Sequence, residues 1–480
     1  MVSVALPAIQ RDLGTSVAAA QWVVNGYLQP LSALILVGGA AGDRFGRRRV
    51  FAIGVLLFTA ASVACAAAPG AAPLILARAA QGIGGALLVP SSLAIISAAF
   101  PPEARGRAIG TWAGFSALTA ALGPLLGGWL VDVGSWRLIF LVNLPVAAVT
   151  LWLLRGVPES RGDTGAVDWT GGALAALGLG SLVYGLTAAA DPDWTQARVL
   201  GPVAAGLALL GLFVRHEART AAPMLPLELF RARAFSGANL MTLLLYAALS
   251  GALFFLPFNL IRVQGYSATQ AGAAFLPFTL IMAALSRRAG GLVARYGARG
   301  PLVAGPCVAG LGLALLAVPG IGGGFVATFL PGMVVLGLGM TISVAPLTTT
   351  VMGAVPDRHA GAASGINNAV ARMAGMLAVA VLGALAVRVF GDALAERLAA
   401  ISLPPGAADR LLAQASRLTE ARPPAGLAAA GRAAERAIAE SFVAAFRATM
   451  LVAAGLSLAS AACAALTIHA APPSVRRGAC

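Results

Sequence analysis

Long apolar runs recur along the whole of this 480-residue chain. Each run has about 20 residues, the length that an α-helix needs to cross the hydrocarbon core of a bilayer. Because no water can hydrogen bond to the backbone there, such runs must be helical. A membrane β-barrel would instead show short segments of alternating polarity. The pattern therefore predicts an all-α polytopic membrane protein.

The composition excludes an ordinary soluble domain. Apolar residues make up 59% of the chain and charged residues 11%, whereas about a quarter of a soluble domain is charged. The formal net charge of +15 could suggest a nucleic-acid partner, but the basic residues are all arginines and they lie between the apolar runs. We therefore expect no nucleic acid and a protein surrounded by membrane lipids.

Clusters of arginine, proline and glycine separate thirteen expected spans. Residues 1–9 are too short to span but end like a helix, so we interpret them as the end of a fourteenth, truncated helix. The expected spans are 21–41, 50–68, 73–98, 106–130, 137–155, 169–190, 198–215, 237–258, 268–288, 301–318, 324–345, 361–388 and 443–468.

Arginines are distributed unequally between the two sides of these spans. With the loop 42–49 in the cytoplasm, cytoplasmic loops hold nineteen arginines and the opposite short loops hold four. Arginine near span ends favours the cytoplasmic side, which predicts the orientation. The long segment 391–442 would lie outside, as a surface amphipathic helix broken by Pro404-Pro405 and Pro423-Pro424.

A weak internal repeat suggests two related halves. Segment 39–48, with the pattern Gly-x-x-x-Asp-Arg-x-Gly-Arg-Arg, is echoed at 290–299 by Gly-x-x-x-Ala-Arg-x-Gly-Ala-Arg. Transporters often consist of such repeats around a site near the membrane midplane. We expect an N-terminal bundle at 1–155, two linking helices with a cytoplasmic loop at 156–230, and a C-terminal bundle at 231–480.

The first motif is the loop at 39–49. Its glycines permit close helix approach and a tight turn, and its acid can lie against a helix N-terminus, whose dipole favours an anion. An ordinary cytoplasmic loop would carry similar charge, but the spacing and the echo favour a gating latch. The expected latch residues are Gly39, Asp43, Arg44, Gly46, Arg47 and Arg48.

The second motif contains an arginine inside an apolar span. A charge there is costly and needs an internal partner or a water-filled cavity. Gln81 lies near the same helix face as Arg78, and Gly82 lets a neighbouring helix approach. We interpret Arg78, Gln81 and Gly82 as a polar hub for proton coupling. The alternative is an arginine that reaches the outer interface.

The third motif lies in span 106–130. Gly106, Gly110 and Gly114 recur every fourth residue and form a smooth face, and Pro124 removes a helix hydrogen bond and bends the span. Generic helix packing is the alternative, because membrane helices are rich in glycine. We favour a sliding surface with a hinge. Its expected residues are Gly114, Gly123, Pro124, Gly127 and Gly128.

Polar or aromatic side chains inside spans are candidate substrate contacts, although each is more often a packing residue. They are Asn25, Tyr27, Gln29, Trp112, Asn239 and Tyr246. The sequence has no Ser/His/Asp or metal-ligand cluster and no Gly-x-x-x-x-Gly-Lys loop for a nucleotide. We therefore expect no enzyme, no metal and no cofactor beyond a proton gradient.

These three motifs, in this order, resemble those of the major facilitator superfamily. More closely, the chain is similar to the fourteen-helix drug:proton antiporter family, and the Gly123-Pro124 motif resembles the signature of exporters rather than importers. The supporting segments are 4–9, 21–24, 136–145, 223–230, 263–267 and 363–368.

The resemblance implies two six-helix bundles plus two extra helices at 169–190 and 198–215. It implies that Asp43 and its arginines gate the path, that Arg78 joins proton coupling, and that the Gly123-Pro124 helix couples the halves. The family's acid in the first helix would fall upstream of Met1. This predicts a miscalled start or a truncated chain that lacks the proton carrier.

Together these features predict a monomeric, multi-pass protein of a bacterial plasma membrane, from a bacterium with GC-rich DNA. It would export drugs or other lipophilic or cationic small molecules in exchange for protons, by alternating access. The alternatives are a dedicated exporter of an endogenous antibiotic or siderophore, a membrane protein that binds without transporting, and an inactive truncated chain.

Overall fold

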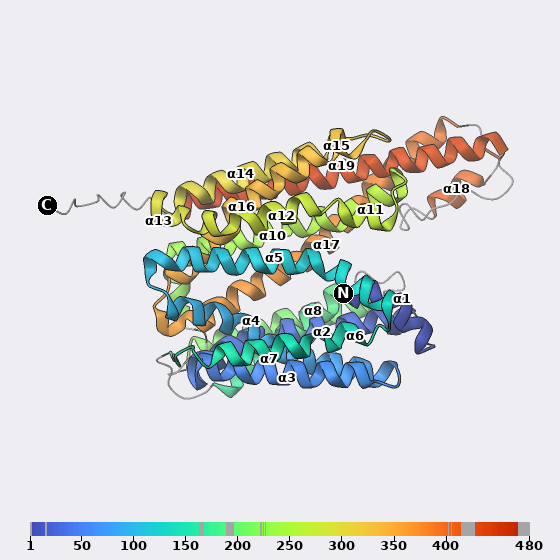
Figure 1. Cartoon of the computed structure of the whole chain (residues 1–480). Helices are drawn as coiled ribbons and strands as arrows, with labels where there is room; N and C mark the ends of the chain where they lie inside the picture. The colour runs from blue at the N-terminus through green and yellow to red at the C-terminus, as the bar shows by residue number, and fades with distance from the viewer. Residues whose placement is uncertain are drawn as a thin grey trace.

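The computed structural model is a bundle of long helices (Figure 1), with no strand in the part of the chain that it describes. That part comprises residues 2–14, 17–162, 168–188, 196–220, 223, 225, 227–401, 403–404, 406–413 and 428–468. The long helices are α2 (Val17–Phe45), α3 (Arg47–Ala67), α4 (Ala71–Ala99), α5 (Pro102–Val133), α8 (Trp169–Ala188), α9 (Gln196–Glu217), α10 (Arg233–Phe258), α14 (Arg299–Leu316), α16 (Leu330–Gly353), α17 (Ala360–Ala399) and α19 (Ala428–Thr467). The shorter elements are α1 (Val2–Asp12), α6 (Leu138–Leu141), α7 (Asn143–Leu154), η1 (Leu227–Arg231), η2 (Asn259–Val263), α11 (Ala268–Ala273), α12 (Leu276–Gly290), α13 (Leu292–Tyr296), α15 (Phe325–Thr328), η3 (Asp357–His359) and α18 (Ala407–Leu412).

In the part of the chain that the structure describes, every expected span falls on one or two helices. Within the described residues, ten helices are long and apolar enough to cross a membrane, and the other expected spans fall on α5 and on the pairs α6–α7 and α11–α12. Where α12 and α16 begin, a proline lies in the first turn, a position that needs no N–H donor. The all-α polytopic fold is confirmed.

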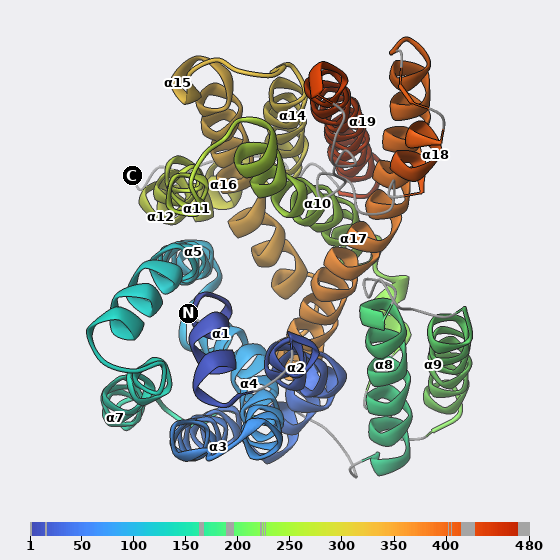
Figure 2. The ribbon, with the colours of Figure 1, turned by 90° about the vertical axis from the view of Figure 1, so that its right-hand side faces the viewer.

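The helices form two groups with a smaller pair beside them. Figure 2 shows α1 to α7 on one side and α10 to α19 on the other, with α8 and α9 standing apart. Helix α8 packs against both α2 and α17, and α9 packs against α8. The groups meet where α5 runs along α12 and α16, and where α17 runs along α2 and α4.

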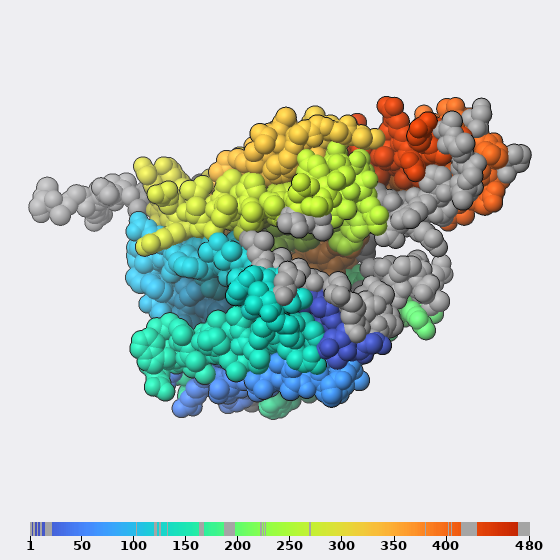
Figure 3. All heavy atoms as spheres, turned by 45° about the vertical axis from the view of Figure 1, so that its right-hand side comes forward, coloured from blue at the N-terminus to red at the C-terminus, as the bar shows by residue number. Residues whose placement is uncertain are grey.

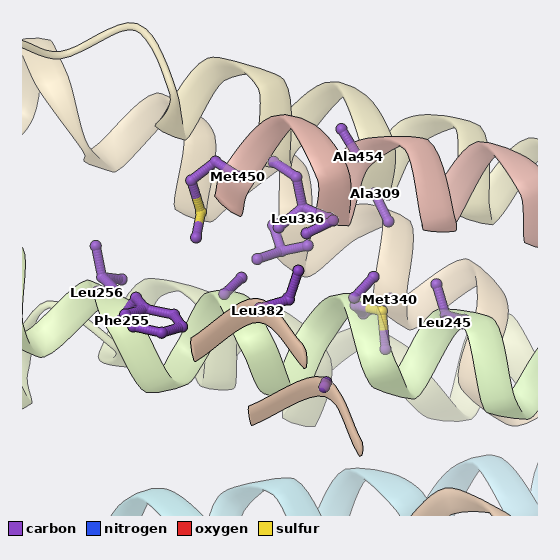
Figure 4. Packing of buried hydrophobic residues seen from close by; sticks show 14 of the residues in the cluster. Leu245, Phe255, Leu256, Ala309, Leu336, Met340, Leu382, Met450 and Ala454 are labelled. Carbon is purple, nitrogen blue, oxygen red and sulfur yellow. The ribbon is translucent and has the colours of Figure 1, made fainter. Parts of the chain in front are cut away.

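The second group has a continuous apolar core. Figure 4 shows Phe255, Leu256 and Leu245 of α10 facing side chains of the neighbouring helices. Their partners in the same buried cluster come from α14, α16, α17 and α19. Lipid is as apolar as these side chains, so close van der Waals packing is what holds such helices together in a membrane.

The expectation of a surface helix over 391–442 is met only in the break at Pro404, because residues 391–399 and 428–442 belong to α17 and α19. Helices α17 and α19 have 40 residues each and are therefore about 60 Å long, twice the hydrocarbon thickness of about 30 Å. Both project beyond the other helices, with α18 beside them (Figures 1 and 3). We call the described residues of 390–442 the distal hairpin.

Apolar contacts within the distal hairpin explain why its helices continue. Leu394 and Leu398 of α17, Leu411 of α18 and Phe442 of α19 are buried in one cluster. Each helix therefore finds a partner for its apolar face beyond the membrane. Pro404 follows the end of α17, and Pro405, Pro423 and Pro424 lie outside the described residues.

Candidate functional site

Asp43, near the end of α2, binds the start of α17. Its side chain is 1% exposed, and its two carboxylate oxygens accept hydrogen bonds from the N–H groups of Gly361 and Ala362, each 3.0 Å long. First-turn N–H groups have no partner within their own helix, and the helix dipole favours an anion there. The expected contact between this acid and a helix N-terminus is present, and it joins the two groups of helices.

Arg47, in the first turn of α3, completes this contact. Its Nε and Nη2 atoms donate to Oδ1 of Asp43 at 2.9 and 2.8 Å, and Nη2 also donates to the carbonyl of Asp357 in η3. Both side chains of the pair are buried. Removing one partner of a buried pair leaves an uncompensated charge, which costs about 3–5 kcal/mol. Asp43 and Arg47 therefore act as one unit across α2, α3 and α17.

Glycines bring the backbones close enough for these contacts. A Cβ atom on Gly39 would overlap the carbonyl oxygen of Gly361, and a Cβ on Gly361 would overlap that of Gly39. Helices α2 and α17 thus cross in direct backbone contact. Gly46 has φ +106°, a conformation that L-residues rarely adopt, and it lets the chain pass from α2 into α3 within one residue.

Arg48 of the latch and the neighbouring Arg49 contact the segment after α7. The side chain of Arg48 donates to the carbonyl of Val157 at 3.0 Å, while the backbone N–H groups of Arg48 and Arg49 donate to the Glu159 carboxylate. Arg44 is exposed. Glu159 therefore caps the start of α3, in the same way as Asp43 caps α17.

A second glycine contact joins the two groups along α5 and α12. A Cβ on Gly106 would overlap the carbonyl of Gly290, one on Gly110 would overlap that of Ser286, and one on Gly114 would lie 3.0 Å from that of Ala283. The expected smooth face is therefore a helix–helix contact at the same end of the molecule as Asp43. We call the end at which residues 42–49 lie the latch end.

The hinge part of the third motif is only partly described. Helix α5 runs without interruption from Pro102 to Val133. Gly127 is buried, and Gly123 and Gly128 are partly buried. The side chain of Pro124 lies outside the described residues.

Arg78 lies inside the first group of helices and does not reach an interface. It is 6% exposed, its Nε donates to the carbonyl of Val23 at 3.0 Å, and its Nη1 donates to Gln81. The guanidinium lies 4.4 Å from the centre of the Tyr27 ring, at cation–π distance. A Cβ on Gly82 would overlap the carbonyl of Tyr27, so glycine lets α4 approach α2.

The hub extends to two residues that sequence reasoning missed. Gln81 donates to the hydroxyl of Ser62 at 2.7 Å, and Asn143 donates to the same hydroxyl at 3.1 Å. The network therefore links α2, α3, α4 and α7. Both are polar residues within apolar stretches, and this was the sequence signal that could have identified them as part of the hub.

Two of the six candidate substrate residues line one large cavity. Tyr27 and Trp112 border a cavity of 1350 Å³ together with Arg107, Arg287 and Arg372. Arg372 lies about 18 Å along α17 from its start, and its Nε is buried without a hydrogen-bond partner among the described residues. Sequence reasoning missed Arg372, although an arginine within span 361–388 is the same signal that marked Arg78.

The other candidates lie elsewhere. Gln29 borders a groove of 690 Å³ between α2, α8 and α9. Asn239 is buried, donates to the carbonyl of Phe235 at 3.0 Å and accepts from Asn367 of α17 at 3.3 Å, so it serves helix packing. Asn25 and Tyr246 line neither of these cavities.

Comparison with known proteins decides the family. The model of the Major Facilitator Superfamily matches residues 1–398. The chain belongs to this superfamily. It is 32% identical to the tetracenomycin C resistance and export protein of Streptomyces glaucescens, over 98% of this chain and 89% of the relative. It is 36% identical to the puromycin resistance protein pur8 of Streptomyces alboniger, over 82% and 80%, and 36% identical to the multidrug resistance protein Stp of Mycobacterium tuberculosis, over 80% and 72%.

Solved structures of major facilitators share this fold. The human organic anion transporter MFSD10 superposes with a TM-score of 0.59 at 16% identity, over 96% of this chain and 89% of that one. The proton:xylose symporter XylE gives 0.53 at 18% identity, over 78% and 82%. The expected fold is confirmed, and this facilitator is a multi-pass protein of the plasma membrane.

Several latch contacts of this facilitator have no local sequence signal. Residues from distant segments meet the junction of α2 and α3 at 39–49. The backbone N–H of Gly162 donates to the carbonyl of Asp43 at 2.8 Å, the carbonyl of Asp357 accepts from Arg47, and Glu159 accepts from the N–H groups of Arg48 and Arg49. Asp357 also forms an ion pair of 3.2 Å with Arg105. One turn, η3, therefore contacts both the α3 and α5 sides of the latch end.

Proposed function

We propose that this facilitator exports drugs or other lipophilic small molecules across the plasma membrane by alternating access, driven by inward proton movement. The observation that carries the proposal is the latch between α2 and α17, in which a buried acid holds the start of a helix from the opposite group. The relatives described above are named for drug resistance or export, which supports the proposal.

Opening the latch end would separate contacts that are few and discrete. Asp43 would leave the first turn of α17, and the glycine seam between α5 and α12 would part. Such packed contacts favour two distinct arrangements over continuous deformation. By the arginine distribution the latch end faces the cytoplasm, so the latched state would close that side.

Protons would supply the energy, with no other cofactor and no catalytic step. A charge that crosses the membrane potential releases about 2.3 kcal/mol per 100 mV. The buried hub around Arg78 has hydrogen-bond partners that are neutral, so its role would be to respond to a proton carried elsewhere. We keep Arg78, Gln81 and Gly82 as the proposed coupling residues on this ground.

The 1350 Å³ cavity would receive the substrate. Ligand pockets of about 300–1,000 Å³ hold drug-sized molecules, so this space suffices for a bulky one. Tyr27 and Trp112 would offer aromatic surfaces. Of the expected substrates, lipophilic molecules are favoured over cationic ones, because three arginines border the cavity. We propose that the protein acts as a monomer among membrane lipids.

A dedicated exporter of an endogenous metabolite is the second candidate. Relatives named for tetracenomycin C export and, in Streptomyces coelicolor, for probable actinorhodin transport favour it. Such an exporter would move one family of compounds, whereas a multidrug exporter would move chemically unrelated ones.

Reconstitution into proteoliposomes tests both candidates. An inward pH gradient should drive efflux of lipophilic dyes, and a protonophore should abolish it. Efflux of several unrelated dyes favours multidrug export, and efflux confined to one chemical class favours the dedicated exporter. If folded, monodisperse protein binds dyes but never moves them under the gradient, the export proposal is wrong and a binding protein is favoured.

A further inference from the structure

Three titratable side chains meet where α8 begins and α9 ends, in the pair of helices that stands beside the two groups in Figure 2. Asp168 immediately precedes α8, and its side chain is 5% exposed. His216 and Glu217 are the last residues of α9, and Glu217 is 3% exposed. No motif named above includes them, and the proposed transport steps do not use them.

Asp168 is held in its charged form. It accepts a hydrogen bond of 2.8 Å from the N–H of Gly171, in the first turn of α8, and its carboxylate lies 2.9 Å from Nε2 of His216. Burial opposes its ionisation, but the N–H of Gly171 and His216 outweigh burial and keep the pKa of Asp168 below its usual value.

Glu217 lies directly beside this charge. A Cβ built on Gly171 would be within 2.5 Å of both Oδ2 of Asp168 and Oε1 of Glu217, so these two oxygens are no more than about 5 Å apart. Glu217 Oε1 has no hydrogen-bond donor among the described residues. Two neighbouring buried carboxylates disfavour double ionisation, so one of them keeps a proton.

We infer that Glu217 is a proton-binding site at the latch end of this protein, with Asp168 as its charged partner. The proton belongs on Glu217 because Asp168 has the donors that stabilise the charged form. In the described part of the chain, the titratable groups that act on Glu217 are Asp168 from the start of α8 and His216 from α9. Among the described residues of the linker after α9, the group that acts on Glu217 is the backbone N–H of Leu225.

The proton controls a clasp on that linker. Oε2 of Glu217 accepts a hydrogen bond of 2.8 Å from the N–H of Leu225. Leu225 is buried in the main apolar cluster with Leu229, which η1 carries, and with Phe235 of α10. The clasp therefore fixes the point at which the α8–α9 pair connects to the second group of helices.

Loss of the proton would weaken the clasp. An ionised Glu217 would place a second negative charge beside Asp168 in a buried position, which is unfavourable unless the carboxylate moves towards water. Moving it breaks the bond to Leu225. We therefore expect the linker to be docked when the proton is bound and released as the pH rises through the range in which Glu217 ionises.

Hydrogen exchange on the full chain in nanodiscs tests the clasp. Between pH 6 and 9, after correction for intrinsic exchange, protection of the peptide containing Leu225 should fall about tenfold or more. Glu217→Gln keeps a neutral acceptor and should stay protected at every pH. The matched control Glu228→Gln, at an exposed acid of η1, should behave like the unaltered protein.

Infrared difference spectroscopy tests the proton itself. The unaltered protein should lose a protonated carboxyl band over the same pH range, the band should be absent in Glu217→Gln, and Asp168→Asn should move its loss to lower pH. Protection that does not change with pH, or a band that persists in Glu217→Gln, would overturn the inference. Neither readout depends on export, so a failed transport assay leaves this test intact.

Discussion

Replacing Asp43 by asparagine should unlatch the protein. The substitution keeps the size of the side chain but removes the charge that pairs with Arg47 and caps α17. Arg47, which is 1% exposed, would then be a buried charge without a counter-charge. This destabilises the latched state by about 3–5 kcal/mol. Because 1.36 kcal/mol is a factor of ten, the ratio of latched to unlatched protein should fall by roughly two to four orders of magnitude.

Distances between spin labels measure this ratio. Labels at Phe45→Cys and Arg358→Cys, both exposed positions at the latch end, would be placed in a chain in which the exposed Cys307 is changed to serine, and Cys480 of the sequence likewise. With Asp43 intact, the two labels should lie at one short distance. With Asp43→Asn, the distribution of label distances should be longer and broader.

Two controls separate the latch from general damage. Glu103→Gln removes an exposed acid in the first turn of α5 and should leave the short distance unchanged. Combining Asp43→Asn with Arg47→Met removes both buried charges and should restore much of the latched population, since the pair then leaves nothing uncompensated. An unchanged distance in Asp43→Asn alone would refute the reasoning.

Three further predictions concern other contacts. Gly106→Ala places a methyl group against the carbonyl of Gly290 and should slow dye efflux from proteoliposomes tenfold or more, whereas Gly211→Ala, which meets open space, should not. Arg78→Lys cannot reproduce the guanidinium fork that reaches two acceptors, so gradient-driven efflux should drop about tenfold while dye binding, followed by fluorescence polarisation, stays within twofold. Asp12 has a lowered pKa because Arg137 and Trp136 donate hydrogen bonds to it, so its stabilising effect is present above its unfolded pKa and lost as the pH falls through the lower folded value. Melting temperatures of the unaltered protein and Asp12→Asn should therefore differ at neutral pH and converge in strong acid.

The membrane helices could be predicted because the signal for them is local. A run of about 20 apolar residues is a property of one segment, and the acid of the 42–49 loop was expected at a helix N-terminus from its residue type alone. The partner helix was not predictable, because nothing near Gly361 marks it as the site that receives Asp43. Glu159 and Asp357 were missed for the same reason, since they are ordinary loop acids until the fold brings them to the latch.

In the distal hairpin, the sequence did not reveal how far the membrane helices continue. The sequence there contains arginines, acids and prolines, which favoured a surface amphipathic helix broken at the prolines. Leu394 and Leu398 instead continue the apolar face of α17 and find partners on α18 and α19. Hydropathy marks where a helix can leave the membrane, but only packing decides whether it ends there. Arg372 was within reach of the sequence, because a charge inside a span is unusual wherever it occurs.

Because α17 is one unbroken helix, a movement at one of its ends is transmitted to the other side of the membrane. One rigid rod begins at the N–H groups that hold Asp43, passes Arg372 at the cavity and ends among the leucines beyond the bilayer. A rod of about 60 Å that pivots by about 10° swings its far tip by about 10 Å. With the latch end in the cytoplasm, as proposed above, a molecule outside the cell that immobilised this tip would hinder the release of Asp43 from α17 without ever touching it.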